Sequence, residues 1–163
     1  MTLTLKNKDT IEINEFIFKC CIGKNGKSKK KIEGDKKTPI GIYNLGNLYY
    51  RADRHKKPKT SLKTQIIKKK MGWCNDINNK KYNKIINTNK KIKHEKLYRK
   101  DSKYDFFIPI KYNFFKPKSG KGSAIFIHIT NDYKPTAGCI AISKKDFLIM
   151  LKIINKKSKI KIY

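Results

Sequence analysis

The spacing of apolar residues is the feature that most constrains the fold of this chain. In the first half, short apolar runs alternate with turn residues. The run from Phe16 to Ile22, for example, is followed by Gly-Lys-Asn-Gly at residues 23–26, which is typical of a strand and a tight turn. Further on, residues 124–129 form a largely apolar run of the length expected for a buried strand. These patterns predict strands rather than long helices.

Helical spacing is found only near the carboxyl end. Ser143, with Asp146 three residues later, has the pattern of a helix N-cap, and apolar residues then recur at helical spacing. Two isoleucines alternate with lysines in the last residues, which predicts a closing strand. The apolar residues of the helix are Phe147, Leu148, Met150, Leu151 and Ile154, and those of the strand are Ile160 and Ile162.

The length of the chain indicates one domain. Its 163 residues are slightly above the commonest domain size of about 100–150 residues, and no internal repeat or linker is evident. Between residues 56 and 100 the sequence becomes polar, with runs of lysine and asparagine. We expect residues 1–163 to form one domain, with residues 56–100 as an insertion or cap in which His94 to Arg99 form a helical turn.

The charge of the chain is strongly positive. There are 41 Lys and Arg residues against 12 Asp and Glu, a net charge of +29, and such a field attracts polyanions. The lysines are spread from Lys6 to Lys161 and accompany no nucleic-acid-binding motif, so we expect no specific nucleic-acid partner. Most lysines are expected to face water, while non-specific attraction to anionic polymers or membrane surfaces stays open.

The cysteines and histidines do not form a metal or disulfide pattern. The four cysteines are too few and too irregularly spaced for a disulfide framework, and the three histidines do not have the spacing of zinc ligands. We therefore expect no metal and no cofactor. The residues concerned are Cys20, Cys21, Cys74, Cys139, His55, His94 and His128.

Two of these residues form a candidate catalytic pair. His128 ends a predicted strand and Cys139 begins the next, so a returning loop would bring them together. A cysteine attacks carbonyls as the thiolate, which a nearby imidazole generates by removing the proton. Gly138 would let backbone N–H groups form an oxyanion hole. The alternative is a core histidine with satisfied hydrogen bonds beside an inert buried thiol.

Three segments resemble one enzyme family. Residues 120–142, which contain Thr-Ala-Gly-Cys at 136–139, resemble the catalytic segment of L,D-transpeptidases of the YkuD type. Residues 34–41 are similar to that family's Gly-Asp-x-x-Thr-Pro-x-Gly loop. Residues 72–76, Gly-Trp-Cys-Asn-Asp, are similar to a tryptophan motif of one subgroup. The resemblance extends over roughly residues 15–163.

The resemblance implies a mainly β fold, a curved sheet or sandwich with a few helices, and a role in cell-wall biogenesis and cell shape. Cys139 would take the acyl group from a peptidoglycan tetrapeptide stem and pass it to an amine, with His128 as general base. The backbone of Ala137, Gly138 and Cys139 would form the oxyanion hole. A carbonyl near Ile129 or Thr130 would orient the imidazole.

The sequence departs from the common family motif at two points. That motif reads Ser-His-Gly-Cys with an arginine two positions later, whereas this chain has Thr-Ala-Gly-Cys at residues 136–139 and Ala141 in place of the arginine. Arg54 or Arg99 is a candidate to bind the substrate carboxylate instead, because arginine binds carboxylates bidentately. Thr136 is a further candidate substrate contact.

Trp73 is open to two interpretations. It would line the substrate groove as a stacking surface, or it would pack in the interior, as single tryptophans often do.

The activity itself has two alternatives to L,D-transpeptidation. An L,D-carboxypeptidase would use the same thioester with water as acceptor, and a non-catalytic basic module would only bind anionic polymers.

Location is a second open question. The resemblance implies the cell envelope, yet no signal peptide is visible and no run of roughly 20 apolar residues is present, so a cytoplasmic site stays open.

Overall fold

The structure is a computed structural model that describes residues 1–88 and 92–163. Strands hold 37% of the residues and helix 6%, which confirms the prediction of a mainly β fold. The strands are β1 Thr2–Leu5, β2 Thr10–Ile13, β3 Phe16–Cys21, β4 Lys27–Ser28, β5 Thr38–Pro39, β6 Gly41–Asn44, β7 Leu48–Tyr50, β8 Thr64–Ile66, β9 Met71–Cys74, β10 Ile85–Asn87, β11 His94–Lys96, β12 Phe106–Pro109, β13 Phe126–Thr130, β14 Ile140–Ser143 and β15 Lys159–Ile162, and the helix is α1 Lys144–Ile153.

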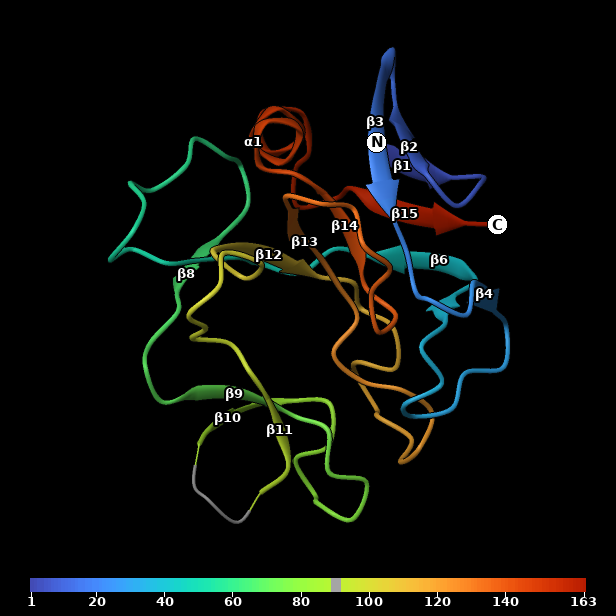
Figure 1. Ribbon diagram of the computed structural model, residues 1–163, viewed down its shortest axis with the longest axis vertical. Helices are drawn as coiled ribbons and strands as arrows, with labels where there is room; N and C mark the ends of the chain where they lie inside the picture. Colours follow the sequence, from blue (N-terminus) through green and yellow to red (C-terminus); the bar gives the residue numbers. More distant parts are fainter. Residues whose placement is uncertain (89–91) are drawn as a thin grey trace.

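Ten strands form one curled sheet in the order β6-β15-β1-β2-β3-β14-β13-β12-β7-β8. Most neighbours in it are antiparallel, but β1 and β15, β7 and β8, and β13 and β14 run parallel. The chain passes from β13 to β14 through the segment that ends at Cys139. Figure 1 shows this pair near the middle of the molecule, with β9, β10 and β11 forming a separate three-stranded sheet below it.

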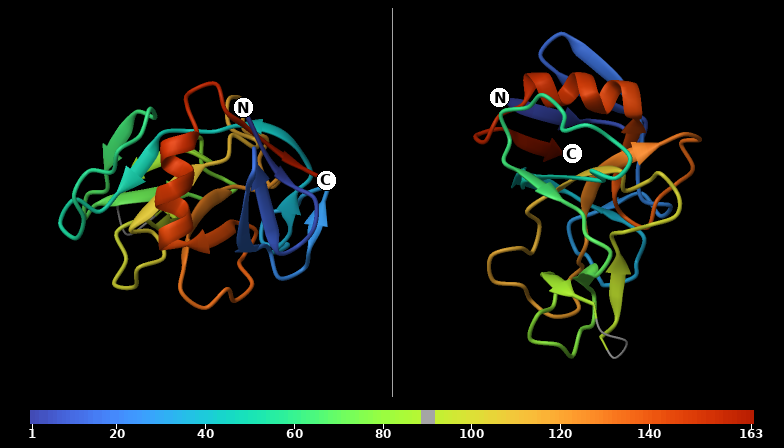
Figure 2. Two further views of the ribbon diagram at one scale, coloured as in Figure 1. Left: turned by 90° about the horizontal axis from the view of Figure 1, so that it is seen from above. Right: turned by 90° about the vertical axis from the view of Figure 1, so that its left-hand side faces the viewer.

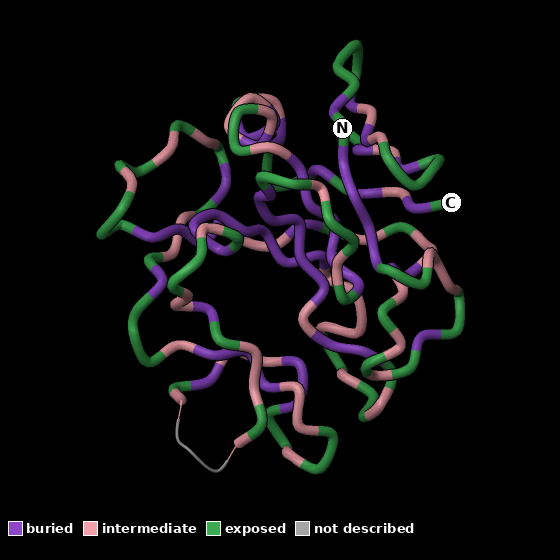
Figure 3. The backbone as a smooth tube through the Cα atoms, viewed as in Figure 1, coloured by how far each residue is buried: buried purple, intermediate pink, exposed green. Residues whose placement is uncertain are grey.

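The central strands are buried on both faces. Every residue of β12 and β13 is buried, as the purple trace through the centre of Figure 3 shows. Successive side chains of a strand point to opposite faces. Phe106 therefore packs toward α1, with its ring 6.1 Å from that of Phe147. Phe107 packs on the other face, 4.7 Å from Phe126. The sheet thus separates a core under α1 from a second core that contains Cys139.

The helix forms where the sequence predicts it. The Ser143 hydroxyl accepts a hydrogen bond from the Asp146 backbone N–H at 3.0 Å, and Phe147, Met150 and Leu151 are buried against the sheet. Figure 2 shows α1 lying across this face. No helix in the described ranges has the length and apolar character needed to cross a membrane.

The prediction of a helical turn at His94 to Arg99 is wrong. His94–Lys96 is instead strand β11, which pairs with β9 in the register His94 to Cys74 and Lys96 to Gly72. Pairing with β9 decides the conformation here. Gly72 permits the close approach, since a Cβ atom at that position would lie 2.7 Å from the His94 ring. Within the predicted polar segment 56–100, residues 89–91 lie outside the described part of the chain.

Candidate active site

The parallel pair β13 and β14 brings the predicted nucleophile and base to one place. In its register His128 lies opposite Ala141, so Cys139, just before β14, lies beside the start of β13. The Phe126 backbone N–H donates to the Cys139 sulfur at 3.3 Å, and the thiol donates to the Ala124 carbonyl at 3.2 Å. The returning loop predicted between the two residues therefore exists.

Hydrogen bonds fix the backbone turn that precedes Cys139. The Thr136 hydroxyl donates to the Cys139 carbonyl at 2.6 Å and accepts from the Gly138 N–H at 3.1 Å. From the loop at residues 34–41, the Thr38 hydroxyl donates to the Gly138 carbonyl at 2.9 Å. The structure thus places two segments of the family resemblance in direct contact.

Gly138 is required in this turn by its conformation. Its φ is +134°, in a region that side-chain-bearing residues rarely adopt. A Cβ atom there would lie 2.9 Å from the Lys37 carbonyl oxygen. The close approach of the two loops therefore depends on glycine at this position.

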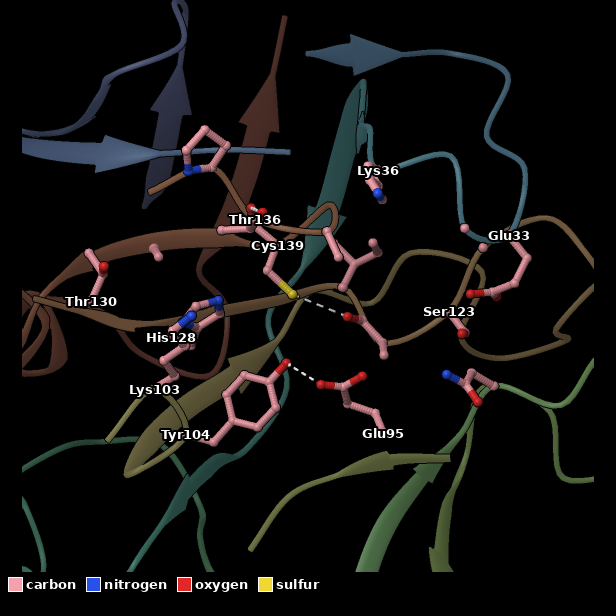
Figure 4. A pocket seen from close by; sticks show the side chains of 18 of the residues that line it. Glu33, Lys36, Glu95, Lys103, Tyr104, Ser123, His128, Thr130, Thr136 and Cys139 are labelled. Atoms are coloured by element: carbon pink, nitrogen blue, oxygen red, sulfur yellow. Dashed lines mark hydrogen bonds between the residues drawn. The ribbon is translucent and has the colours of Figure 1, made fainter. Parts of the chain in front are cut away.

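A pocket of about 450 Å³ opens beside the catalytic pair. Figure 4 shows the Cys139 sulfur near its centre, with His128 on one side and Tyr104 below. Cys139 is 6% and His128 5% exposed, so the reacting groups lie at the bottom of the pocket rather than on its rim.

The His128 side chain is held in one tautomer. Its Nδ1 lies 2.9 Å from the Ile129 carbonyl oxygen, and because a carbonyl only accepts, Nδ1 carries the proton of the neutral ring. Nε2 is then left as the basic nitrogen. The predicted orientation of the imidazole by a carbonyl at Ile129 or Thr130 is confirmed for Ile129. The Tyr104 ring packs edge-on against the imidazole at 5.2 Å.

Burial favours the neutral forms of both candidate catalytic groups. It lowers the pKa of His128 to about 4, with Lys103 and Arg99 acting in the same direction against the Ile129 carbonyl. It raises the pKa of the Cys139 thiol to about 12, although the Phe126 N–H acts against the shift. Among the described residues, no hydrogen bond joins the sulfur to the imidazole. A resting thiolate–imidazolium pair is therefore disfavoured, and proton transfer has to accompany attack.

Of the predicted substrate contacts, Arg99 and Thr136 line this pocket and Arg54 does not. Arg54 bonds Asp105 at 2.7 Å and the carbonyls of residues 99, 100 and 101. It therefore ties two chain segments together. Arg99 also has a partner, because its guanidinium bonds the Asp101 carboxylate at 2.6 Å.

Trp73 packs beneath the site and is not part of the pocket lining. It is 3% exposed, its indole N–H donates to Asn83 Oδ1 at 2.8 Å, and its ring meets Phe126 edge-on at 5.0 Å. Trp73 follows Gly72 in the middle strand of the small sheet, where a side chain facing the core is covered by both sheets. Its contribution to the site is support for Phe126.

Several residues that line the pocket were not singled out from the sequence. They come from segments far apart in the chain, and of these Asn75 and Ser123 lie within segments that resemble the family. All four cysteines are free and buried, and no cluster of His, Cys, Asp or Glu suited to a metal occurs among the described residues. The additional pocket residues include Lys31, Glu33, Asn75, Glu95, Lys103, Tyr104 and Ser123.

The mainly β fold with its curled sheet is that expected of a YkuD catalytic domain. A family model described as the L,D-transpeptidase catalytic domain, YkuD, matches residues 2–162. The chain belongs to this family, whose members act on peptidoglycan peptide stems. A comparison with curated protein sequences gives no match.

Two solved structures are similar in fold. The crystal structure of the helical cell shape determining protein Pgp2 from Campylobacter jejuni has a TM-score of 0.53 and 20% identity, covering 99% of this chain and 46% of that one. A point mutant of Pgp2 has a TM-score of 0.50 and 19% identity, with the same coverage. The present chain thus spans less than half the length of that protein.

Proposed function

We propose that the protein is a peptidoglycan L,D-transpeptidase that acts on tetrapeptide stems through a thioester on Cys139. The observation that carries the proposal is the position of the Cys139 sulfur and the His128 imidazole at the bottom of one pocket. The matching family model supports the same reaction class. A peptide stem entering the pocket would present a carbonyl carbon to the thiol.

In the first half of the reaction, His128 Nε2 removes the thiol proton while the sulfur attacks the carbonyl carbon. The sulfur–carbon bond forms, and the imidazolium then gives its proton to the leaving amine as the carbon–nitrogen bond breaks. The terminal D-residue departs and the acyl group stays on Cys139. In the second half an incoming amine attacks the thioester and loses a proton to the imidazole. The carbon–sulfur bond breaks, the imidazolium returns the proton to the Cys139 sulfur, and the cross-linked or exchanged product is released.

The oxyanion of each tetrahedral intermediate would be held by the backbone of Ala137, Gly138 and Cys139. The Gly138 N–H already donates to Thr136 Oγ1, so the amides of Ala137 and Cys139 are the principal donors in this proposal. Thr136, which holds the turn, takes the structural place of the serine in the common motif. We regard Thr-Ala-Gly-Cys as the mark of a subgroup.

The organisation and location of the protein follow from the same proposal. Residues 1–163 are a single catalytic domain in which the segment 56–100 caps the pocket, since Asn75, Lys93, Glu95 and Arg99 from this segment line it. The substrate implies a periplasmic or cell-envelope location. The high positive charge would hold the protein near anionic wall polymers by attraction that is not sequence-specific.

Product analysis tests the activity. Wild type, Cys139→Ser and His128→Ala are incubated with a disaccharide tetrapeptide, with and without an added D-amino acid, and the products are separated by liquid chromatography. Transpeptidation predicts an exchanged tetrapeptide from wild type only, with both variants reduced at least about a hundredfold. Release of tripeptide alone would identify an L,D-carboxypeptidase. No turnover by folded wild type, with polymer binding retained, would support the binding module and contradict the proposal.

A further inference from the structure

One end of the pocket has no role in the acyl-transfer steps described above. Figure 4 shows Glu33, Ser123 and Glu95 to one side of the Cys139 sulfur, with His128 and Thr130 on the other. This end adjoins Ala124, whose carbonyl accepts the thiol hydrogen bond. A substrate that reaches the sulfur therefore passes close to these side chains.

Two phenols orient the carboxylates at this end. The buried Tyr82 hydroxyl donates to Glu33 Oε2, and the buried Tyr104 hydroxyl donates to Glu95 Oε1 at 3.0 Å. A carboxylate has about four acceptor positions, so each phenol occupies only part of its partner. Both carboxylates line the pocket and can accept further hydrogen bonds from a ligand.

Two buried polar atoms lie at the same end without a partner. Ser123 Oγ and Asn75 Oδ1 make no hydrogen bond with any described residue, and both residues line the pocket. Ser123 is only 7% exposed. An unsatisfied buried polar group costs about 1–3 kcal/mol, and such groups are rare in folded proteins. Two of them in one pocket indicate hydrogen bonds that a bound molecule completes.

The neighbouring cations are either paired or directed to solvent. Lys31 Nζ is bound by the Asp35 carboxylate and by the Lys37 carbonyl at 2.7 Å. Arg99 bonds Asp101 and lies 3.6 Å from Glu95. Lys36 and Lys93 are exposed. The groups at this end that can accept hydrogen bonds from a ligand are the two carboxylates and the Ser123 and Asn75 oxygens.

We propose that this end of the pocket, formed by Glu33, Glu95, Asn75 and Ser123, binds a primary ammonium group of the substrate. An ammonium has three N–H donors, and the two carboxylates and the Ser123 and Asn75 oxygens offer four acceptor groups for them. The inference rests on the proposed function, because it requires a peptide acylating Cys139. The ammonium belongs either to a side chain of the acyl-donor stem or to the acyl acceptor, which then gives one proton to a carboxylate of this cluster before the free amine attacks the thioester.

The test compares two donor peptides on one enzyme. Tetrapeptides with a third-position lysine, its side-chain amine free or acetylated, are used to measure kcat/KM for loss of the terminal D-residue. Wild type is expected to prefer the free amine at least about tenfold, as for a charge-assisted hydrogen bond. Glu33→Gln and Glu95→Gln should bring the ratio toward one. Using the ratio cancels any general loss of activity in a variant.

The second arm tests the acceptor amine, and a control variant tests whether the effect is specific to this end of the pocket. If the ammonium belongs to the acceptor, the donor ratio is near one, but both Glu→Gln variants raise the KM for the amine. Asp132→Asn, which alters a pocket carboxylate hydrogen-bonded to Thr130, should change neither quantity. Wild type without preference in either arm, or preferences that persist in both Glu→Gln variants, would overturn the inference. A carbapenem adduct on Cys139 in those samples would show that the proposed nucleophile is intact. If no adduct forms, the proposed function fails, and not only the ammonium site.

Discussion

At the residue scale, burial rather than ion pairing sets the chemistry of the catalytic pair. The Cys139 thiol and the His128 imidazole are both kept neutral because the pocket floor offers little solvation for charge. In the proposed mechanism, thiol activation is therefore coupled to the binding of substrate, whose carbonyl receives the developing negative charge. The Ile129 carbonyl contributes by holding the histidine tautomer in which Nε2 is basic.

The depressed pKa of His128 predicts an unusual acid limit of activity. With a pKa of about 4 against an ordinary value near 6.5, the free imidazole is the main form down to about pH 4, so the acid limb of kcat/KM should lie near that value. Between pH 4 and 6.5 the unfolded chain binds more protons at His128 than the folded chain does. The free energy of unfolding is therefore highest above about pH 6.5, as far as His128 is concerned, and falls as the pH drops toward 4. An acid limb near pH 6.5 in protein shown to be folded would contradict this account.

Gly138 predicts a local stability effect. Alanine there would be forced into a φ of +134° and against the Lys37 carbonyl oxygen, at a cost on the order of 1–3 kcal/mol. Gly34→Ala is the matched control. Gly34 also has a positive φ, +79°, but nothing lies within 4 Å of an added Cβ. Chemical denaturation should show the larger loss in free energy of unfolding for Gly138→Ala. Equal losses for the two variants would contradict a steric cost at Gly138.

Sequence reasoning predicted that His128 and Cys139 lie together, but it did not predict the rest of their pocket. His128 and Cys139 are separated by a single loop between neighbouring strands, so their meeting depends on local order in the chain. Glu95 and Tyr104 meet only after the small sheet has packed on the large one. The depth of Trp73 likewise depends on both sheets, so its sequence context does not distinguish a groove position from packing.

At the scale of elements, pairing and packing decide conformation where local signals are weak. The helix α1 had both a cap and a periodic apolar face, and it was predicted correctly. The segment at His94 had neither and forms a strand because it pairs with β9. The sequence therefore predicted elements with their own strong pattern and missed the element that depends on a partner.

Phe147 is expected to contribute most of the attachment of α1 to the sheet. It is fully buried and contacts the ring of Phe106, so Phe147→Ala should lower the free energy of unfolding by about 3–5 kcal/mol. Leu148 on the same helix is only partly buried, and Leu148→Ala should cost clearly less. Urea denaturation followed by circular dichroism would measure both. Similar losses for the two variants would show that α1 is not anchored through Phe147.

At the scale of the whole molecule, the net charge of +29 predicts binding to anionic polymers that weakens steeply with salt. Because this charge is spread over the surface, Cys139→Ala should bind such a polymer as wild type does. Co-sedimentation of wild type and Cys139→Ala with the polymer at low and high ionic strength measures the salt dependence and compares the two proteins. Binding that is insensitive to salt would point to a specific polymer site in place of general attraction.

The central claim is that Cys139 accepts an acyl group, and intact-protein mass spectrometry tests it most directly. Wild type, Cys139→Ala and Cys21→Ala are incubated with a disaccharide tetrapeptide or a carbapenem. Cys21 is a second buried thiol, located on the neighbouring strand opposite Ala141, and serves as the matched control. The account predicts a covalent adduct on wild type and on Cys21→Ala but none on Cys139→Ala. An adduct that persists in Cys139→Ala, or no adduct on any folded sample, would contradict it.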